Sequence, residues 1–140
     1  MVVDASVWVS RLVPQDANHI ASREWFTRQI AGGGLLIAPA LLLAEVAAAI
    51  SRRTGAPALA HQAVRDMQRL PMLRLVSVDQ RLARQAAKLA ADLGLRGADA
   101  VYVAAAQQLK VALITWDKEQ QERAATRIVV QAPSSEPSPN

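Results

Sequence analysis

The sequence predicts an α/β protein with a three-layer α/β/α arrangement around a central, mostly parallel sheet. Short runs of apolar and β-branched residues alternate along the chain with longer stretches of helical periodicity, a pattern typical of parallel sheets covered on both faces. With 140 residues, 51% of them hydrophobic, the chain is also of a length that forms one domain around one core. We therefore expect a single domain over residues 1–131. The remaining segment, 132–140, is rich in Pro and Ser and is expected to be disordered.

The first strand is expected in MVVDASVWV, residues 1–9, because apolar residues lie on both of its faces, as in a central parallel strand. Asp4 then falls in the carboxyl-terminal half of this strand. A helix is expected over residues 18–31. Its core-facing stripe is predicted to consist of Ile20, Trp25, Phe26 and Ile30.

Glycine and proline mark the limits of the next elements. The glycines at 32–34 end the helix, and the run LLIA after them predicts a short strand. Pro39 suits the first turn of a helix that runs to Gly55. A further helix is expected over residues 57–70.

The second half of the chain continues the alternation. The strand MLRLVSV leads to Asp79, a good N-cap for a helix that Gly94 ends. Another helix is expected to begin at Asp99. The strand VALIT, a short helix and the strand TRIVVQ complete the predicted sheet.

Four carboxylates interrupt or border apolar runs. They are Asp4 in VVDASV, Glu45 in LLLAEVAAAI, Asp99 in DAVYVAAA and Asp117 in ALITWD. Burying an ionised carboxylate without a partner is costly, and these runs carry no matching Arg or Lys. Glu45 is expected about two turns into its helix, facing inward. Asp99 and Asp117 also fit a purely structural role as helix caps, but four such residues together predict convergence on a divalent cation.

The chemistry of the four side chains favours particular metals. Two carboxylates about 4 Å apart repel by roughly 4 kcal/mol at an effective dielectric near 20, so a cluster takes up protons or recruits cations. Hard oxygen ligands favour Mg²⁺ or Mn²⁺. A zinc site is not expected, because the chain has no Cys and both His19 and His61 lie in polar helical contexts.

The charge balance favours a phosphate-bearing partner. The chain has 16 Lys and Arg against 12 Asp and Glu, a formal charge of +4, so an acidic cluster would lie within a basic exterior. No signal peptide is expected, because Asp4 and Arg11 break the N-terminal apolar run. No membrane span is expected either, since LLIAPALLLAEVAAAI is too short and is interrupted. The absence of Cys fits a cytoplasmic protein.

The order of the acidic motifs resembles that of the PIN domain. It consists of an Asp in the first strand, a Glu in a helix after Pro, an Asp opening a DA-x-x-x-A-A helix, and T-x-D after a strand. In this chain these are VVDASVWV, PALLLAEVAAAI, LRGADAVYVAAA and LITWDKE. Their spacing resembles that of the VapC-like toxins of bacterial toxin–antitoxin systems. The resemblance covers residues 2–130.

The resemblance implies a PIN-like fold and a Mg²⁺- or Mn²⁺-dependent endoribonuclease that acts as the toxin of a toxin–antitoxin pair. RNA is then the substrate, and a cognate antitoxin and a second copy of the chain are the expected partners. Cleavage is expected to leave a 5′-phosphate and a 3′-hydroxyl. An alternative is a catalytically silent PIN-like module that binds RNA without cutting it.

The resemblance also implies roles for individual residues. The acidic site would comprise Asp4, Glu45, Asp99 and Asp117. Asp4 and Asp99 are expected to hold the metal directly, with Glu45 and Asp117 completing the shell. Supporting hydroxyls are expected from Ser6 and Thr115, whose alternative role is local turn hydrogen bonding.

Residues around the acidic site are expected to shape substrate binding. Trp116 is bulkier than the residue expected between Thr and Asp, and it is expected to reshape the rim. Candidates for phosphate contacts are Arg11, Arg52, Arg53 and Arg96, which could equally be solvated charges at helix ends.

Two other folds place an Asp after the first strand. A phosphotransfer fold of the haloacid dehalogenase type needs a second Asp two residues later, where this chain has Ser6. A receiver domain could use Asp79 as its acceptor, but it carries adjacent acids after strand one, where this chain has Ala5. Neither alternative explains Glu45.

Overall fold

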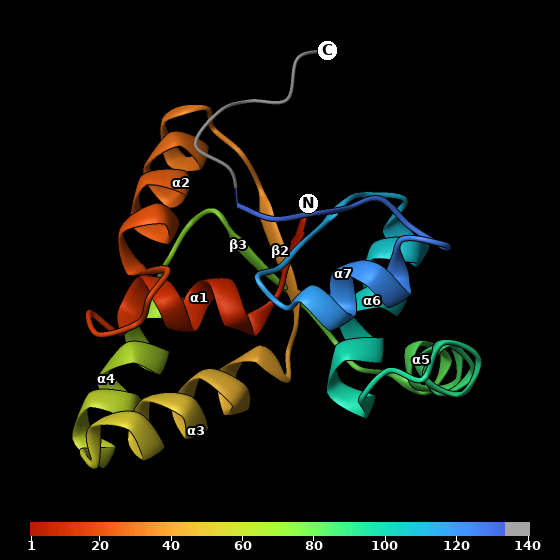
Figure 1. Cartoon of the computed structure of the whole chain (residues 1–140). Coiled ribbons are helices and arrows are strands. Elements are labelled where there is room, and N and C mark those ends of the chain that lie inside the picture. Colours follow the sequence, from red (N-terminus) through yellow and green to blue (C-terminus); the bar gives the residue numbers. More distant parts are fainter. Residues whose placement is uncertain (134–140) are drawn as a thin grey trace.

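The computed structural model describes residues 1–133, and its strands form one parallel sheet (Figure 1). Within this part of the chain the sheet has five strands in the order β3-β2-β1-β4-β5, and every neighbouring pair is parallel. The strands are β1 (Val2–Val3), β2 (Leu36–Pro39), β3 (Leu73–Val76), β4 (Leu113–Ile114) and β5 (Val130–Gln131). Because all strands run in the same direction, the segments that follow β1 and β4 lie side by side at the carboxyl end of the sheet.

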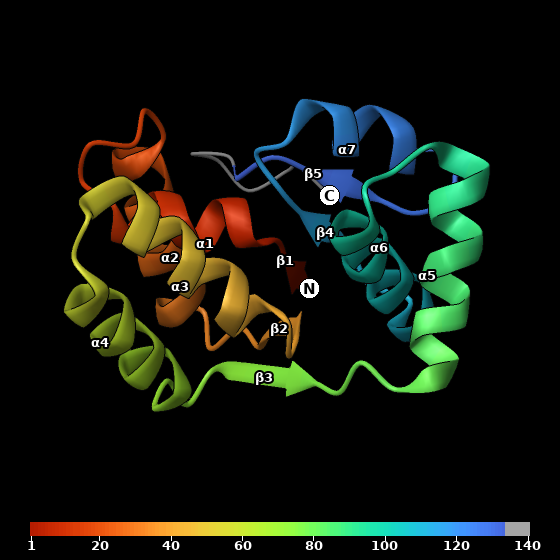
Figure 2. The ribbon, with the colours of Figure 1, turned by 90° about the horizontal axis from the view of Figure 1, so that it is seen from below.

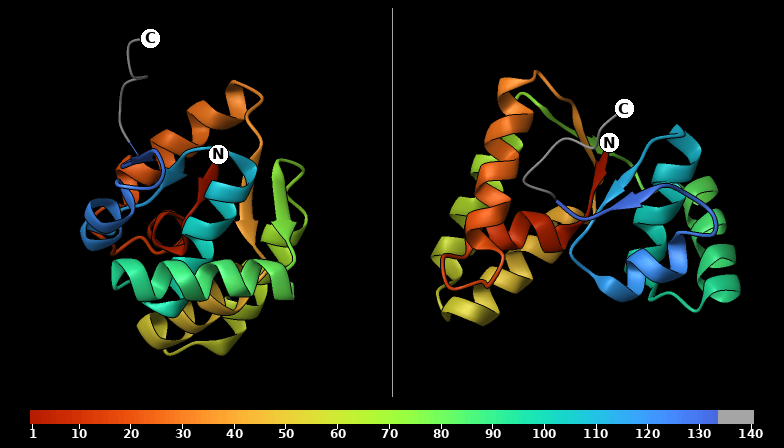
Figure 3. Two further views of the ribbon diagram at one scale, coloured as in Figure 1. Left: turned by 90° about the vertical axis from the view of Figure 1, so that its right-hand side faces the viewer. Right: turned by 45° about the horizontal axis from the view of Figure 1, so that its top comes forward.

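Helices cover both faces of the sheet. They are α1 (Ala5–Leu12), α2 (His19–Ala31), α3 (Leu42–Thr54), α4 (Pro57–Gln68), α5 (Gln80–Leu93), α6 (Gly97–Leu109) and α7 (Lys118–Ala124). Figure 2 shows α1 to α4 on one side of the strands and α5 and α6 on the other. Figure 3 shows α5 lying alongside α6, with α7 beside the β4 and β5 end of the sheet. This arrangement confirms the predicted three-layer α/β/α class.

The core is a single apolar cluster between the layers. Val2, Val3, Leu36 and Leu113 are fully buried in the sheet. On the α1–α2 side the rings of Trp8 and Phe26 lie 4.6 Å apart, and those of Trp25 and Phe26 lie 5.1 Å apart. On the other side α6 buries a run of alanines, whose small side chains let the helix pack closely on β1 and β2. The core therefore relies on many small contacts.

The predicted stripe of α2 is only half right. Trp25 and Phe26 are buried, but Ile20 is 71% exposed and Ile30 is 47% exposed. The spacing of apolar residues identified the helix, but it does not show which side of the helix another element covers. These two isoleucines lie on the molecular surface.

The first predicted strand is wrong beyond Val3. Residues 5–12 form α1, and Asp4 is the N-cap of that helix, with its side chain accepting a hydrogen bond from the Ser6 backbone at 3.0 Å. An apolar run that is buried on all sides fits a buried helix as well as a central strand. Asp4 therefore follows the strand instead of lying within it.

Three further boundaries differ from the predictions. Pro39 is the last residue of β2 and does not open a helix. Consequently α3 starts at Leu42, and Glu45 lies in its first turn, not two turns in. α6 begins at Gly97, so Asp99 lies in the first turn and is not the cap.

Other boundary predictions are confirmed. Asp79 caps α5 by accepting a hydrogen bond from the Leu82 N–H at 2.8 Å. Gly55 and Gly94 end α3 and α5 with a positive φ of 65°, a conformation in which a side chain would be strained. Most of the segment 132–140 lies outside the described residues, so the domain limit at residue 131 stays a prediction. Among residues 1–133, no helix has the length and apolar character needed to cross a bilayer.

Candidate active site

Asp4 is a buried carboxylate at the carboxyl end of β1. Its side chain is only 5% exposed, and Oδ2 accepts hydrogen bonds from the Ser6 N–H at 3.0 Å and the Thr115 hydroxyl at 3.2 Å. Burial raises the pKa of Asp4, the hydrogen bonds from Ser6 and Thr115 oppose that shift, and the charge of Asp117 adds to it. Asp4 is thus held firmly in a place where its negative charge is costly.

The segment after β4 brings a second carboxylate to the same carboxyl end of the sheet. Asp117 caps α7 by accepting a hydrogen bond from the Gln120 N–H at 3.0 Å. Two hydroxyls tie this segment to the start of α1: Ser6 Oγ accepts from the Trp116 N–H at 3.1 Å, and Thr115 Oγ1 accepts from the Asp117 N–H at 3.1 Å. Ser6 Oγ and Thr115 Oγ1 are themselves 3.3 Å apart. Both hydroxyls therefore fix the loops that carry Asp4 and Asp117.

Glu45 is supplied by α3 and is oriented by a tyrosine on α6. The Tyr102 hydroxyl donates a hydrogen bond to Glu45 Oε1 at 2.8 Å, and the Tyr102 ring is fully buried. Burial raises the pKa of Glu45, the Tyr102 hydrogen bond opposes the shift, and the charges of Asp4 and Asp99 add to it. The pKa of Tyr102 is raised as well, first by burial and then by the Glu45 charge, so its hydroxyl remains a donor.

Asp99 completes the group from the first turn of α6. Burial, followed by the charges of Asp4 and Asp117, raises the pKa of Asp99 to about 6. The Arg96 guanidinium, at the N-cap of the same helix, acts in the opposite direction but does not prevent the rise. Asp99 and Glu45 each respond to the charge of Asp4, and Asp99 also responds to that of Asp117.

The four carboxylates form an acidic cluster without an ion-pair partner. The ion pairs among residues 1–133 join Arg53 to Asp16, Arg123 to Glu119 and Arg127 to Asp92, none of which belongs to the cluster. The charges of Asp4, Asp99 and Asp117 act on one another or on Glu45, whereas the convergence of the four on a cation stays a prediction. Their mutual repulsion adds to the effect of burial in raising the pKa of Asp4, Glu45 and Asp99.

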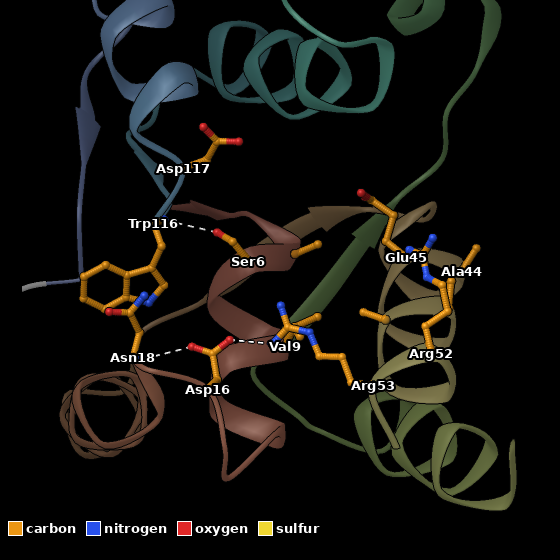
Figure 4. Close-up of a pocket in the computed structure, with 13 residues that line it drawn as sticks. Ser6, Val9, Asp16, Asn18, Ala44, Glu45, Arg52, Arg53, Trp116 and Asp117 are labelled. Carbon is orange, nitrogen blue, oxygen red and sulfur yellow. Dashed lines mark hydrogen bonds and ion pairs between the residues drawn. The ribbon is translucent and has the colours of Figure 1, made fainter. Parts of the chain in front are cut away.

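An open cavity of about 630 Å³ adjoins the cluster (Figure 4). It is lined by Ser6, Glu45 and Asp117 and by small apolar residues of α1 and α3. The remaining polar lining consists of Asp16, Asn18, Arg52, Arg53 and Trp116. Such a cavity offers a polymer both acidic groups and cations within one depression.

The two arginines in the cavity differ in how they are held. Arg53 Nη1 pairs with Asp16 Oδ2 at 2.6 Å, while Asp16 Oδ1 accepts from the Asn18 N–H at 2.9 Å. Arg52, next to it on α3, has no ion-pair partner among the described residues. Arg52 is thus the cavity's less constrained cation.

The structure does not bring all four predicted arginines together. Arg52 and Arg53 line the cavity, and Arg96 lies near Asp99. Arg11 instead stacks over the Phe26 ring at 5.0 Å, and it does not line the cavity. Burial lowers the pKa of Arg11, with a further contribution from the charge of Arg23.

The fit of a metal ion rests on the chemistry of the donors. Within residues 1–133, no group of three or more His, Asp or Glu side chains is arranged so that it could hold a metal ion as it stands. The oxygen donors are nevertheless those that Mg²⁺ and Mn²⁺ prefer, and a divalent cation would offset the burial and repulsion that raise the pKa of three of them. The donor set fits a hard cation. His19 hydrogen-bonds the Ser10 carbonyl through Nδ1, and His61 is exposed, so neither joins the cluster.

The comparison with known families gives the fold a name. The family model of the PIN domain matches residues 1–126, nearly the whole chain. The chain belongs to the PIN domain family. No curated protein sequence matches it closely enough to be reported as a relative.

Solved structures agree with the PIN domain assignment. The toxin VapC20 of Mycobacterium tuberculosis, described as cleaving the sarcin–ricin loop, superposes with a TM-score of 0.73 and 20% identity over 91% of this chain and 95% of its own. A toxin–antitoxin complex from Klebsiella pneumoniae gives 0.66 and 20% over 95% and 97%. VapBC2 of Rickettsia felis, bound to a promoter DNA fragment, gives 0.70 and 11% over 94% and 96%. At these identities the similarity establishes the fold.

Three polar or aromatic residues of this PIN domain site were not assigned their positions by sequence reasoning. Tyr102 carried a signal, because a tyrosine in a run of buried alanines needs a partner for its hydroxyl. No sequence signal pointed to Asp16 and Asn18, since they lie in a polar turn between two helices. Their position in the cavity follows from how α1 and α2 pack.

Proposed function

We propose that the chain is a metal-dependent endoribonuclease that acts as the toxin of a toxin–antitoxin pair. The observation that carries the proposal is the acidic cluster, in which burial and neighbouring carboxylates raise the pKa of Asp4, Glu45 and Asp99, and in which no described ion pair includes a cluster member. Such a cluster suits a divalent cation, and the cavity beside it has two arginines for RNA phosphates. Membership of the PIN domain family and the similarity to VapC20, described as a toxin that cleaves the sarcin–ricin loop, support the same conclusion.

In the proposed mechanism Asp4 and Asp99 would hold Mg²⁺ or Mn²⁺ directly, and Glu45 and Asp117 would complete the shell. A bound ion of this kind supplies a water of lowered pKa and neutralises charge on phosphate oxygens. Ser6 and Thr115 keep Asp4 and Asp117 in place through the hydrogen bonds that join their loops. Glu45, oriented by Tyr102, accepts a proton from the attacking water.

The arginines near the acidic cluster orient the RNA substrate in this mechanism. Arg52 contacts an RNA phosphate, because it is the cation that no described carboxylate neutralises. Arg53, tied to Asp16, maintains the shape of the wall, and Arg96 adds positive charge beside Asp99. Attack of water on the phosphorus then breaks the bond to the 3′ oxygen, leaving a 5′-phosphate and a 3′-hydroxyl.

The proposed partners are a cognate antitoxin and a second copy of the chain, with RNA of the cytoplasm as the substrate. The similarity to a toxin–antitoxin complex supports the antitoxin. Exposed apolar side chains are available for protein contacts on α2, at Ile20 and Ile30, and on α4, at Leu59. Co-purification and size-exclusion measurements of mass test both partners.

The experiment that tests the activity maps RNA ends. RNA from cells that briefly express the chain is sequenced from its 5′-phosphate ends, beside an Asp99→Asn variant. The proposal expects discrete new ends only with the intact residue, and the same ends from purified protein with Mg²⁺ but not with a chelator. A 2′,3′-cyclic phosphate product would contradict the mechanism. RNA binding without any cleavage, by folded protein, would favour the silent binding module.

A further inference from the structure

Trp116 occupies a position in the cavity that the proposed mechanism does not use. Its indole lines the cavity together with Asn18 and Asp16 at the end opposite Glu45 and Arg52 (Figure 4). The other two tryptophans are core residues, because Trp8 is 0% exposed and Trp25 is 5% exposed, and both pack against Phe26. Trp116 is only half-buried. One tryptophan thus borders the open space while the others fill the core.

The indole of Trp116 is anchored at its polar edge. Nε1 donates a hydrogen bond to Ser22 Oγ at 2.8 Å, and Ser22 is fully buried on α2. Ser22 Oγ lies 2.6 Å from Ser10 Oγ, which in turn donates to the Val7 carbonyl at 3.0 Å. The ring is therefore held in place by a buried chain of hydroxyls. Because the Trp116 side chain is already ordered, it loses little conformational entropy when a ligand binds against it.

The backbone of Trp116 is fixed with respect to the acidic cluster. Its N–H donates to Ser6 Oγ at 3.1 Å, and the Ser6 N–H donates to Asp4. Asp117 follows it directly in the chain. The residue that carries the indole is consequently fixed relative to Asp4 and Asp117, and the ring lies in the cavity that Glu45 and Asp117 also line.

The chemistry of the exposed part of the ring indicates what binds there. The only polar atom of the indole is already satisfied by Ser22, so an apolar, flat surface remains for the cavity. Successive bases of single-stranded nucleic acids stack on such aromatic surfaces, each contributing about 1–3 kcal/mol. The arginines in the same cavity suit the phosphates between those bases.

From this geometry we infer that Trp116 is a stacking platform for an unpaired nucleobase in the cavity that adjoins the acidic cluster. The inference rests on the proposed ribonuclease function and adds a base subsite to it. The subsite restricts cleavage to RNA whose base next to the scissile phosphate is unstacked, as in loops and single strands. A helical RNA duplex offers no free base face to the ring.

The test separates base stacking from phosphate binding. Two short RNA probes of equal length are titrated into metal-free protein: oligoadenylate, and an oligomer with the same ribose phosphates but no bases. Affinities are measured for the wild type, Trp116→Leu, Trp116→Phe and Arg52→Ala, after thermal melting has verified that each variant is folded. Tryptophan emission is recorded in the same titrations.

The subsite predicts that Trp116→Leu weakens oligoadenylate binding roughly tenfold and leaves binding of the abasic oligomer unchanged. Trp116→Phe, which keeps an aromatic face, retains more affinity than Trp116→Leu, whereas Arg52→Ala weakens both probes. Oligoadenylate quenches emission of the wild type but not that of Trp116→Phe, whose two remaining tryptophans are buried.

Other results overturn the subsite. If Trp116→Leu weakens both probes equally, the residue shapes the wall and stacks no base. If it weakens neither while Arg52→Ala weakens both, RNA binds elsewhere in the cavity, and the ribonuclease proposal stands without the subsite. If the wild type binds neither probe and cleaves no RNA, the proposed function fails and the subsite fails with it.

Discussion

Three aspartates follow strands of the same sheet and cap the next helix, yet only two of them belong to the acidic cluster. Asp4 follows β1 and caps α1, Asp117 follows β4 and caps α7, and Asp79 follows β3 and caps α5. All three accept a hydrogen bond from a backbone N–H of the first turn. Their local chemistry is the same.

The strand order separates the three. β1 and β4 are neighbours at the centre of the sheet, whereas β3 forms its edge. Asp4 is buried and acts electrostatically on Glu45 and Asp99, whereas Asp79 is exposed. An Asp cap after a strand therefore becomes a site residue only where the topology brings other carboxylates to it.

The largest expected effect comes from making the same substitution in both regions. Asp4→Asn is expected to lower RNA cleavage at least about a hundredfold, because loss of even an outer partner of a metal costs 10–100-fold. Asp79→Asn, its matched control, is expected to leave cleavage unchanged. Asparagine still caps a helix, so both variants keep their fold. An equal loss of RNA cleavage in the two variants would contradict the claim that only the aspartate at the centre of the sheet belongs to the site.

A smaller loss of cleavage is expected for Tyr102→Phe. The ring remains buried, but Glu45 loses the hydroxyl that orients it. We expect cleavage to fall about tenfold and the concentration of Mn²⁺ required for half-maximal activity to rise, since Tyr102 supports a proposed metal residue. An unchanged requirement for Mn²⁺, with the same loss of rate, would contradict that role.

The acidic cluster is also expected to weaken the metal-free fold as pH rises. The pKa of Asp99 is raised to about 6 in the folded chain from an ordinary value of 3.8, so between these values the folded state binds more protons than the unfolded state. Stability then falls as pH rises through this window, by about 1 kcal/mol after allowance for solvent screening. The raised pKa values of Asp4 and Glu45 act in the same direction.

Urea unfolding at pH 4, 5, 6 and 7 in a chelator measures this loss. Asp99→Asn, which carries no titrating proton there, is expected to show a shallower decline and a higher stability at pH 7. A stability that rises from pH 4 to pH 6 in the wild type would show that the carboxylates are neutralised by groups of the chain itself.

The smallest expected effect concerns the edge of the sheet. Asp79→Ala removes the cap of α5 and is expected to cost about 1 kcal/mol of unfolding free energy. Cleavage per folded molecule is expected to stay at the wild-type level. Denaturant unfolding and an activity assay on the same preparation check both statements, and a loss of cleavage beyond the unfolded fraction would contradict the second.

The sequence predicted the alternation of strands and helices, which depends on local pattern, and it singled out Asp4, Glu45, Asp99 and Asp117 because each interrupts or borders an apolar run. It could not divide residues 1–9 between β1 and α1, since an apolar run buried on all sides fits either element. The exposure of Ile20 and Ile30 was missed for a related reason: periodicity identifies an apolar face but not the element that covers it.

Part of the support around the cluster could not be predicted from the sequence, because it joins residues distant in the chain. The Tyr102 bond to Glu45 spans 57 positions, and the Trp116 bond to Ser22 spans 94. Ser6 and Thr115 were named as supporting hydroxyls, and the structure shows the bonds they make to the loops around Asp4 and Asp117. Contacts of this kind depend on strand order, which short motifs do not encode.

The central claim is that the carboxylates at the centre of the sheet bind a divalent cation as a group. Calorimetric titration of Mn²⁺ into metal-free wild type, Asp99→Asn and Asp79→Asn at pH 7 tests it most directly. The wild type and Asp79→Asn are expected to bind Mn²⁺ with the same affinity and to release protons, while Asp99→Asn loses the binding. Absence of binding in the wild type, or equal binding in all three proteins, would contradict the claim.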